Sequence, residues 1–464
     1  MVFSGLTFLL LFLPSLLVLY FLSGDLRWRN GVLVVFSLIF YAWGEPVMVL
    51  LLIGTTLFNY IIARLMGRAK RPGGKKLCLA LGVIVSLAGL AYFKYAGFFL
   101  SSLSDLLGFE LRFDAPRLPI GISFYTFQIL TYTVDVYRGK VGVQKSFWRL
   151  LLYVSCFPQL IAGPIVQYAD VAAALDHRTT STDDFIDGMS RFLLGLGKKV
   201  LLANTCGSFL LAVLPAGAAP QSIGGAWLSS LLYTLQLYYD FSAYSDMAIG
   251  LGRVLGFTYK ENFLYPFVAA SPTEYWRRWH VSLGSFFRDY VYIPLGGSRR
   301  GKGRQLLNLL IVWTLTGLWH GAAWNFVLWG LYWFVVLVFD KELSRVWEKV
   351  PKLLRWLFTF TAAVVSLTIF YYTDLGALGA HLSALVGRGL PWLDEGTAAA
   401  FRQYALFLPI ACLAALPIAP RLRRAAQKRS ALSFLGTAFA VAVGLLSVLF
   451  LVQQSYNPFI YFRF

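Results

Sequence analysis

The sequence predicts an all-α integral membrane protein that crosses the bilayer many times, and three observations support this prediction. Hydrophobic residues make up 58% of the 464 residues and charged residues only 14%, a balance too apolar for a water-soluble chain of this length. The apolar residues gather in runs long enough for helices that span a bilayer. Short basic clusters separate these runs, as in the loops of multi-pass proteins. We expect about eleven or twelve spans, with re-entrant or interfacial helices around a buried tunnel, in one membrane domain over residues 1–464.

The charge pattern indicates membrane topology rather than nucleic-acid binding. The net charge is +19, but the basic residues lie in short clusters between apolar runs and not along one solvated face. Such clusters face the anionic lipid of the cytoplasmic leaflet. The loop from Arg64 to Lys76 is basic and contains no acid, so we place it in the cytoplasm and the N-terminus outside.

Three further segments bear on the organisation of the chain. The run from Met1 to Leu22 lacks a basic start and a small-residue cleavage site, which predicts a retained first span. The run 147–167 is interrupted by Pro158 and by Gly163-Pro164, which predicts a broken or re-entrant helix packed in protein. Residues 372–397 read as an outer loop that contains His381.

The stretch from Ser271 to Trp324 concentrates the polar and aromatic groups that could carry chemistry. Its first residues, SPTE, form a capping box with Pro at the first helical position, so a helix is predicted to begin there. A helical repeat then places six aromatic or apolar side chains on one face, with His280 among them: Trp276, Trp279, Leu283, Phe286, Phe287 and Tyr290. A second apolar helix ends at Trp319-His320-Gly321. Titratable groups in a membrane segment are candidates for function.

A separate apolar run, 226–252, carries acids and hydroxyls near its middle. Asp240, Tyr244 and Asp246 must face protein or water there rather than lipid. They could line a substrate path, or they could form hydrogen bonds between helices. The four cysteines, Cys78, Cys156, Cys206 and Cys412, lie singly in apolar segments with no metal-ligand spacing, so no metal site is predicted.

Several motifs resemble the membrane-bound O-acyltransferase (MBOAT) family, and within it the alginate O-acetyltransferase-like branch. The resemblance rests on WRRWHVSLGSFFRDYVYIPLGG, LTGLWHGAAWNFVLWG, LPIGISFYTFQILTYTVDVYRG, FPQLIAGPI, LQLYYDFSAYSDMAIGLGRVLGF and the closing NPFIYFRF. It covers nearly the whole chain. It implies an O-acyltransferase of the bacterial inner membrane that moves an acetyl group from a cytoplasmic donor, acetyl-CoA, towards an extracytoplasmic polysaccharide.

The resemblance also implies roles for individual residues and partners. His320 matches the catalytic histidine of the family, and His280 matches its second histidine. An acyl transfer to a hydroxyl needs a base, and burial would keep a histidine neutral and basic. Six further residues near these histidines are candidates for the substrate path: Trp276, Trp279, Arg288, Asp289, Trp319 and Asn325. An extracytoplasmic esterase-like partner is expected to complete the transfer, and no cofactor is expected to stay bound.

The tail 453–464 is predicted on the outer side, and its Tyr461 has two interpretations. The phenol could accept the acetyl group and relay it, or the residue could be an aromatic anchor at the membrane interface. The function has alternatives as well. The acceptor could be peptidoglycan or another envelope polymer, and a transporter or flippase would also carry intramembrane acids and histidines.

Overall fold

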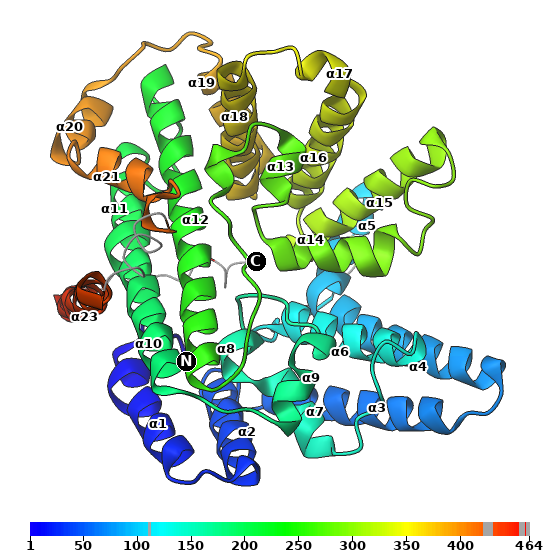
Figure 1. Ribbon diagram of the computed structural model, residues 1–464. Coiled ribbons are helices and arrows are strands. Elements are labelled where there is room, and N and C mark those ends of the chain that lie inside the picture. Colours follow the sequence, from blue (N-terminus) through cyan, green and yellow to red (C-terminus); the bar gives the residue numbers. More distant parts are fainter. Residues whose placement is uncertain (110–112, 421–429, 454–459, 461–464) are drawn as a thin grey trace. The chain divides into compact units, whose positions relative to one another are not determined.

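The computed structural model describes residues 1–109, 113–420, 430–453 and 460, and every regular element among them is a helix (Figure 1). This confirms the all-α fold. The chain forms two compact units, Met1–Phe192 with Tyr244–Glu261, and Leu193–Ala243 with Asn262–Phe464. Because each unit takes two separate stretches, the units are not successive domains, and the single membrane domain over residues 1–464 stays a prediction.

The first unit contains the N-terminal helices. They are η1 (Phe8–Phe12), α1 (Leu13–Phe21), α2 (Leu26–Ala42), α3 (Met48–Arg68), α4 (Pro72–Leu90), η2 (Ala91–Tyr95), α5 (Ala96–Leu107), α6 (Ile122–Tyr137), α7 (Phe147–Ser155), α8 (Phe157–Leu160), α9 (Tyr168–Asp176) and most of α10 (Thr182–Gly197). Phenylalanine rings form its core, among them Phe3, Phe40 and Phe157.

The predicted break in the run 147–167 is present in this unit. Helix α7 ends at Ser155, α8 is a single turn, and residues 161–166 are buried without helical structure. Their backbone has partners in the protein: the Tyr153 hydroxyl donates to the carbonyl of Val166 at 2.8 Å. Non-helical backbone is tolerated at membrane depth only where protein satisfies it, so the prediction of a broken, packed helix is confirmed.

The second unit contains the remaining helices. They are η3 (Lys198–Ala203), α11 (Asn204–Val213), the first part of α12 (Ile223–Val254), η4 (Pro266–Val268), α13 (Pro272–Trp276), α14 (Val281–Phe287), η5 (Arg288–Tyr292), α15 (Lys302–His320), α16 (Trp324–Glu342), α17 (Ser344–Trp347), α18 (Lys352–Tyr371), α19 (Leu375–Leu385), α20 (Glu395–Gln403), α21 (Phe407–Ala414) and α23 (Ser430–Gln453). His381 therefore lies on a helix, α19, and the expectation of a loop around it was wrong.

Five helical stretches of the described chain are long and apolar enough to cross a membrane. They are Met48–Arg68, Pro72–Leu107, Thr182–Val213, Lys352–Tyr371 and Phe434–Gln453. The pair α20 and α21, bent by 70°, makes a sixth if it counts as one span. This number is lower than the eleven or twelve expected, because some apolar runs fold into shorter helices, such as Phe8–Phe21. The protein is nevertheless a multi-pass membrane protein, as predicted.

Glycines set the close approach of α15 and α16. A methyl group on Gly317 would collide with the carbonyl oxygen of Phe326, and one on Gly330 would collide with that of Trp313. Gly321, after His320, faces the ring of Phe326 in the same way. The space beside the Gly321 α-carbon therefore holds the phenyl ring of Phe326.

The helix predicted to run through His280 is broken at that residue. Ser271 caps α13 as predicted, with its hydroxyl accepting from the N–H of Glu274 at 3.1 Å. The chain then turns, and His280 adopts left-handed backbone angles, φ 44° and ψ 53°, before α14 begins. Such angles are uncommon for a residue with a side chain and collect at functional sites. The single continuous aromatic face was therefore a wrong prediction, because the turn at His280 redirects the second half.

Candidate functional site

His320 is the last residue of α15 and lies in an aromatic enclosure. Its side chain is 7% exposed. Its ring centroid is 5.0 Å from those of Trp319 and Trp329 and 5.1 Å from that of Phe370, each in an edge-to-face arrangement. The rings come from three helices, α15, α16 and α18, so the imidazole is fixed from several directions. An aromatic surround excludes water and leaves a buried histidine able to act on a bound substrate.

His280 is more deeply buried, at 1% exposure, and its hydrogen bonds define its tautomer. Its Nδ1 lies 3.2 Å from Oδ1 of Asn262, an oxygen that also accepts from the hydroxyl of Ser282 at 2.9 Å. Because an amide oxygen only accepts, Nδ1 carries the proton and Nε2 keeps a lone pair. This Nε2 is buried without a hydrogen-bond partner in the described part of the chain.

Burial also determines the charge of His280. Removal from water disfavours the imidazolium and lowers the pKa of His280 to about 3. The ring is therefore neutral at physiological pH. Its Nε2 can accept a hydrogen bond from a substrate hydroxyl, whereas so low a pKa makes the ring a weak base.

The fold brings the two histidines together through Trp319. The ring centroid of Trp319 is 5.8 Å from that of His280 and 5.0 Å from that of His320. Residues that lie far apart in the sequence thus contact one indole. Both histidines belong to the predicted core stretch 271–324, and they contact the same ring. That this stretch is catalytic stays a prediction.

Other predicted site residues support this cluster. Trp276 packs its ring against Trp313, Trp329 and Trp333. Asn325 is buried and donates to the carbonyl oxygen of Phe370 at 3.3 Å, which fixes the end of α18 beside His320.

Three further predicted residues lie around this cluster in the second unit. Trp279 is buried and stacks on Tyr275. Arg288 and Asp289 pair with each other at 2.7 Å at the surface.

The predicted polar residues of α12 fall into different units. Asp240 belongs to the second unit, with the histidines, and Tyr244 and Asp246 belong to the first. Tyr244 stacks its ring on Phe3, with centroids 4.5 Å apart. Asp246 forms an ion pair with Arg191 at 2.8 Å, and Arg191 also contacts Glu261. Of these three candidates, only Asp240 is in the same compact unit as His280 and His320.

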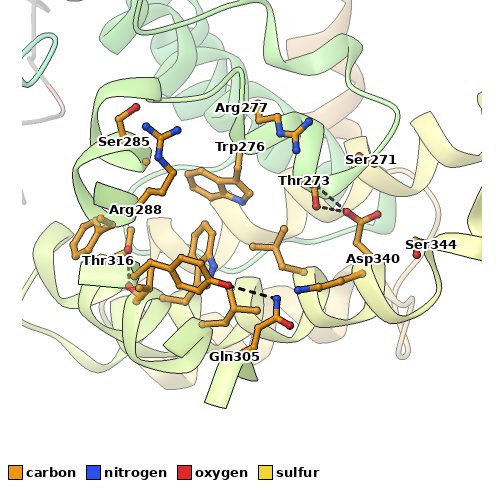
Figure 2. A pocket seen from close by; sticks show the side chains of 18 of the residues that line it. Ser271, Thr273, Trp276, Arg277, Ser285, Arg288, Gln305, Thr316, Asp340 and Ser344 are labelled. Carbon is orange, nitrogen blue, oxygen red and sulfur yellow. Dashed lines mark hydrogen bonds between the residues drawn. The ribbon is translucent and has the colours of Figure 1, made fainter. Parts of the chain in front are cut away.

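A pocket of about 940 Å³ opens in the second unit beside Trp276 (Figure 2). One face of α15 lines it with Gln305, Leu309, Val312 and Thr316, and the next residue on that face is His320. Four basic side chains and two acidic ones contribute to its wall: Arg277, Arg288, Lys341, Arg355, Asp340 and Glu348. The pocket therefore has an excess of positive charge and an apolar side that follows α15 towards the histidine.

Sequence reasoning missed residues that complete the site. Asn262 orients His280 from 18 positions away, and no local pattern marks it. Trp329 and Phe370 enclose His320 but look like ordinary apolar residues of their helices. Lys199 pairs with Asp240 at 2.6 Å, and a lysine within a membrane span could have been noticed. Tyr461 lies outside the described residues.

Comparison with known proteins identifies the family. The model of the membrane-bound O-acyltransferase family matches residues 140–375, which include both histidines. The chain belongs to this family. It is 41% identical over 401 residues to the "Probable alginate O-acetylase AlgI" of Pseudomonas aeruginosa, covering 85% of this chain and 76% of that protein. A protein of the same name from Pseudomonas putida is 38% identical over 492 residues and matches along the full length of both chains.

A third relative is named for a different acceptor polymer. The peptidoglycan O-acetyltransferase of Helicobacter pylori is 34% identical over 388 residues, which cover 76% of this chain and 73% of that protein. The protein is therefore a multi-pass membrane enzyme that transfers acyl groups. The transporter alternative is set aside, because the family and the three relatives described here are named for O-acyl transfer.

Proposed function

We propose that the protein takes an acetyl group from acetyl-CoA at the cytoplasmic face of the bacterial inner membrane and passes it outward for O-acetylation of a polysaccharide, with His320 as the catalytic base. The observation that carries this proposal is the position of His320. It lies one helical turn beyond Thr316, the last residue of α15 that lines the positively charged pocket, and it lies within an aromatic enclosure. The relatives named as O-acetylases support the acetyl group and the polymer acceptor.

The chemistry requires one proton transfer and one exchange of bonds. The hydroxyl oxygen of the acceptor attacks the thioester carbonyl, the C–S bond breaks, and an ester C–O bond forms. His320 takes the hydroxyl proton and returns it to the departing thiolate, so the products are an O-acetyl ester and free coenzyme thiol. His280 is neutral, and its Nε2 has no hydrogen-bond partner among the described residues, so it could orient the acceptor hydroxyl.

The pocket supplies a site for the anionic donor. A coenzyme with phosphate groups is attracted by Arg277, Arg288, Lys341 and Arg355, and the apolar wall along α15 suits the acyl arm. Arg277→Gln is expected to raise the KM for acetyl-CoA about 10-fold with kcat retained, since a hydrogen bond to a charged group is lost. Arg68→Gln, at the exposed end of α3, is the matched control and is expected to leave both constants unchanged.

The C-terminal tail and a partner protein are proposed to carry the acetyl group from the histidine site to the polymer. Tyr461 would receive the acetyl group as a phenyl ester and hand it to an extracytoplasmic esterase-like protein, which acetylates the polymer. An alginate-like polysaccharide is the first candidate, on the names of the Pseudomonas relatives, and peptidoglycan is the second, on that of the Helicobacter relative.

Vesicles of known sidedness test the donor and the direction of transfer. Inside-out membrane vesicles with labelled acetyl-CoA outside are expected to release free coenzyme and to accumulate acetyl ester in the lumen. Release of coenzyme only from right-side-out vesicles would contradict the proposal. Orientation is checked with single cysteines in a chain without native ones: Lys75→Cys is expected to be protected from an impermeant thiol reagent in intact cells, and Val386→Cys, 74% exposed, to react.

A further inference from the structure

Lys199 and Asp240 form a buried ion pair in the second unit. Nζ of the lysine and Oδ1 of the aspartate are 2.6 Å apart, and the side chains are 3% and 1% exposed. Two charges withdrawn from water cost more free energy than an exposed pair would, so a pair kept at this depth needs a further reason. Lys199 lies in η3, a π-helical turn, and such turns are frequent at functional sites.

The second oxygen of the same carboxylate holds the C-terminal tail. Oδ2 of Asp240 accepts from the backbone N–H of Ile460 at 2.9 Å. The side chain of Ile460 is 7% exposed and belongs to the same buried apolar cluster as Tyr238 and Trp279. A carboxylate that binds a backbone amide recognises the backbone and not the identity of one side chain. Asp240 thus holds the backbone at Ile460.

This docking point lies next to the histidine site. Phe241 follows Asp240 directly, and its ring centroid is 4.7 Å from that of His280. Asp240, which binds the N–H of Ile460, is therefore the neighbour in the chain of a residue whose ring contacts His280.

We propose that the Lys199–Asp240 pair is the docking site of the C-terminal tail and that it positions the tail for acyl transfer at the histidines. The ligand is the chain's own C-terminal peptide, recognised by one backbone N–H. Lys199 occupies Oδ1, so Oδ2 stays directed at the tail. Both are positioning residues. The docking rests on the contacts described above. The role in transfer rests on the proposed function, in which Tyr461, the residue after Ile460, receives the acetyl group.

The geometry makes a specific prediction for neutral variants. In Asp240→Asn the amide has one acceptor, which Lys199 takes, so an N–H₂ donor is left facing the N–H of Ile460. The tail is expected to be released. Adding Lys199→Met removes the competing donor, and the asparagine oxygen can again accept from Ile460. The double variant is therefore expected to recover docking that the single variant lacks.

A buried cysteine reports docking directly. Ile460→Cys keeps the backbone N–H and places a thiol where the native side chain is 7% exposed; the other cysteines are removed. In purified full-length protein, this thiol is expected to react slowly with a maleimide. With Asp240→Asn added, the reaction is expected to be at least about 10-fold faster. With both Asp240→Asn and Lys199→Met added, it is expected to be slow again. Asp135→Asn, a buried carboxylate paired with Lys140 in the first unit, is the matched control and is expected to stay slow. Equal rates in the Asp240→Asn and Asp135→Asn proteins would overturn the docking site.

Activity measurements test the positioning role separately. Asp240→Asn is expected to lower polymer acetylation at least about 10-fold with the KM for acetyl-CoA unchanged, and the double variant is expected to recover part of it. A structural defect would alter donor affinity as well and would not be rescued. Fast maleimide labelling of the Asp240→Asn protein, together with full polymer acetylation, would overturn the positioning role of Asp240. His320→Ala is expected to abolish acetylation while labelling stays slow, so failure of the proposed function and failure of docking give different results.

A proline at the contact supplies a second route if the charge variants fold poorly. Ile460→Pro removes the N–H that Asp240 binds, and Ile460→Ala removes the side chain but keeps the N–H. The proline variant is expected to lose polymer acetylation and the alanine variant to retain most of it. Equal activity of the two variants would overturn the assignment of the backbone amide as the recognised group.

Discussion

The second unit contains two buried histidine environments that use the imidazole in different ways. In the first, His280 and His320 meet at Trp319 among aromatic rings, and Nε2 of His280 has no hydrogen-bond partner in the described chain. In the second, His381 on α19 has both nitrogens engaged: Nε2 lies 2.9 Å from the Ser230 hydroxyl, and Nδ1 lies 2.7 Å from that of Tyr372. Burial alone therefore does not distinguish His280 from His381. The hydrogen bonds of their ring nitrogens do.

Apart from variants of His320, the histidine variants expected to lower activity most are those of His280. In His280→Asn, the asparagine tolerates the left-handed backbone and can still form a hydrogen bond with Asn262, but it has no atom at the position of Nε2. We expect a fall in kcat of about 10- to 100-fold with a normal amount of folded protein, because a group that orients the acceptor is lost. His280→Ala is expected to be worse, since it also loses the hydrogen bond to Asn262. Full activity of the asparagine variant would remove Nε2 from the mechanism.

A packing change away from both histidines sharpens the comparison. Gly330→Ala would press a methyl group onto the backbone carbonyl of Trp313 and push α16 from α15, which moves Trp329 away from His320. We expect a loss of stability of about 1–3 kcal/mol and a larger loss of activity than of folded protein. Gly89→Ala on α4, where a methyl group meets open space, is the control. Thermal unfolding and acetyl transfer on the same preparations measure the two effects.

The sequence predicted the helical class, the capped helix start at Ser271 and the grouping of His280 with His320, because these follow from composition and local pattern. It did not predict the turn at His280, since the left-handed angles are imposed by packing and by Asn262. Nor could it find Trp329 and Phe370, which acquire their role only when α16 and α18 fold against α15. His381 was placed in a loop because the apolar run around it, Leu375–Leu385, has only 11 residues and is too short to be read as a span.

The smallest effect on catalysis is expected at His381. His381→Gln would leave Ser230 or Tyr372 without its present partner inside the protein, which costs stability of about 1–3 kcal/mol. Acetyl transfer per folded molecule is expected to stay within about 3-fold of the native value, since no nitrogen of this ring is open to a substrate. A loss of activity comparable to that at His280 would show that the comparison between the two environments is wrong.

The most direct test of the central claim compares His320→Ala with His177→Ala in a single turnover. His177 is exposed after α9 in the first unit, so both variants lose the same side chain and only one loses the proposed base. With excess enzyme and labelled acetyl-CoA, the rate of coenzyme release is expected to fall about 10²- to 10⁴-fold for His320→Ala and to stay unchanged for His177→Ala. The amount of membrane-inserted protein should be the same in both. Release at the native rate from the His320→Ala protein would contradict the assignment of His320 as the catalytic base.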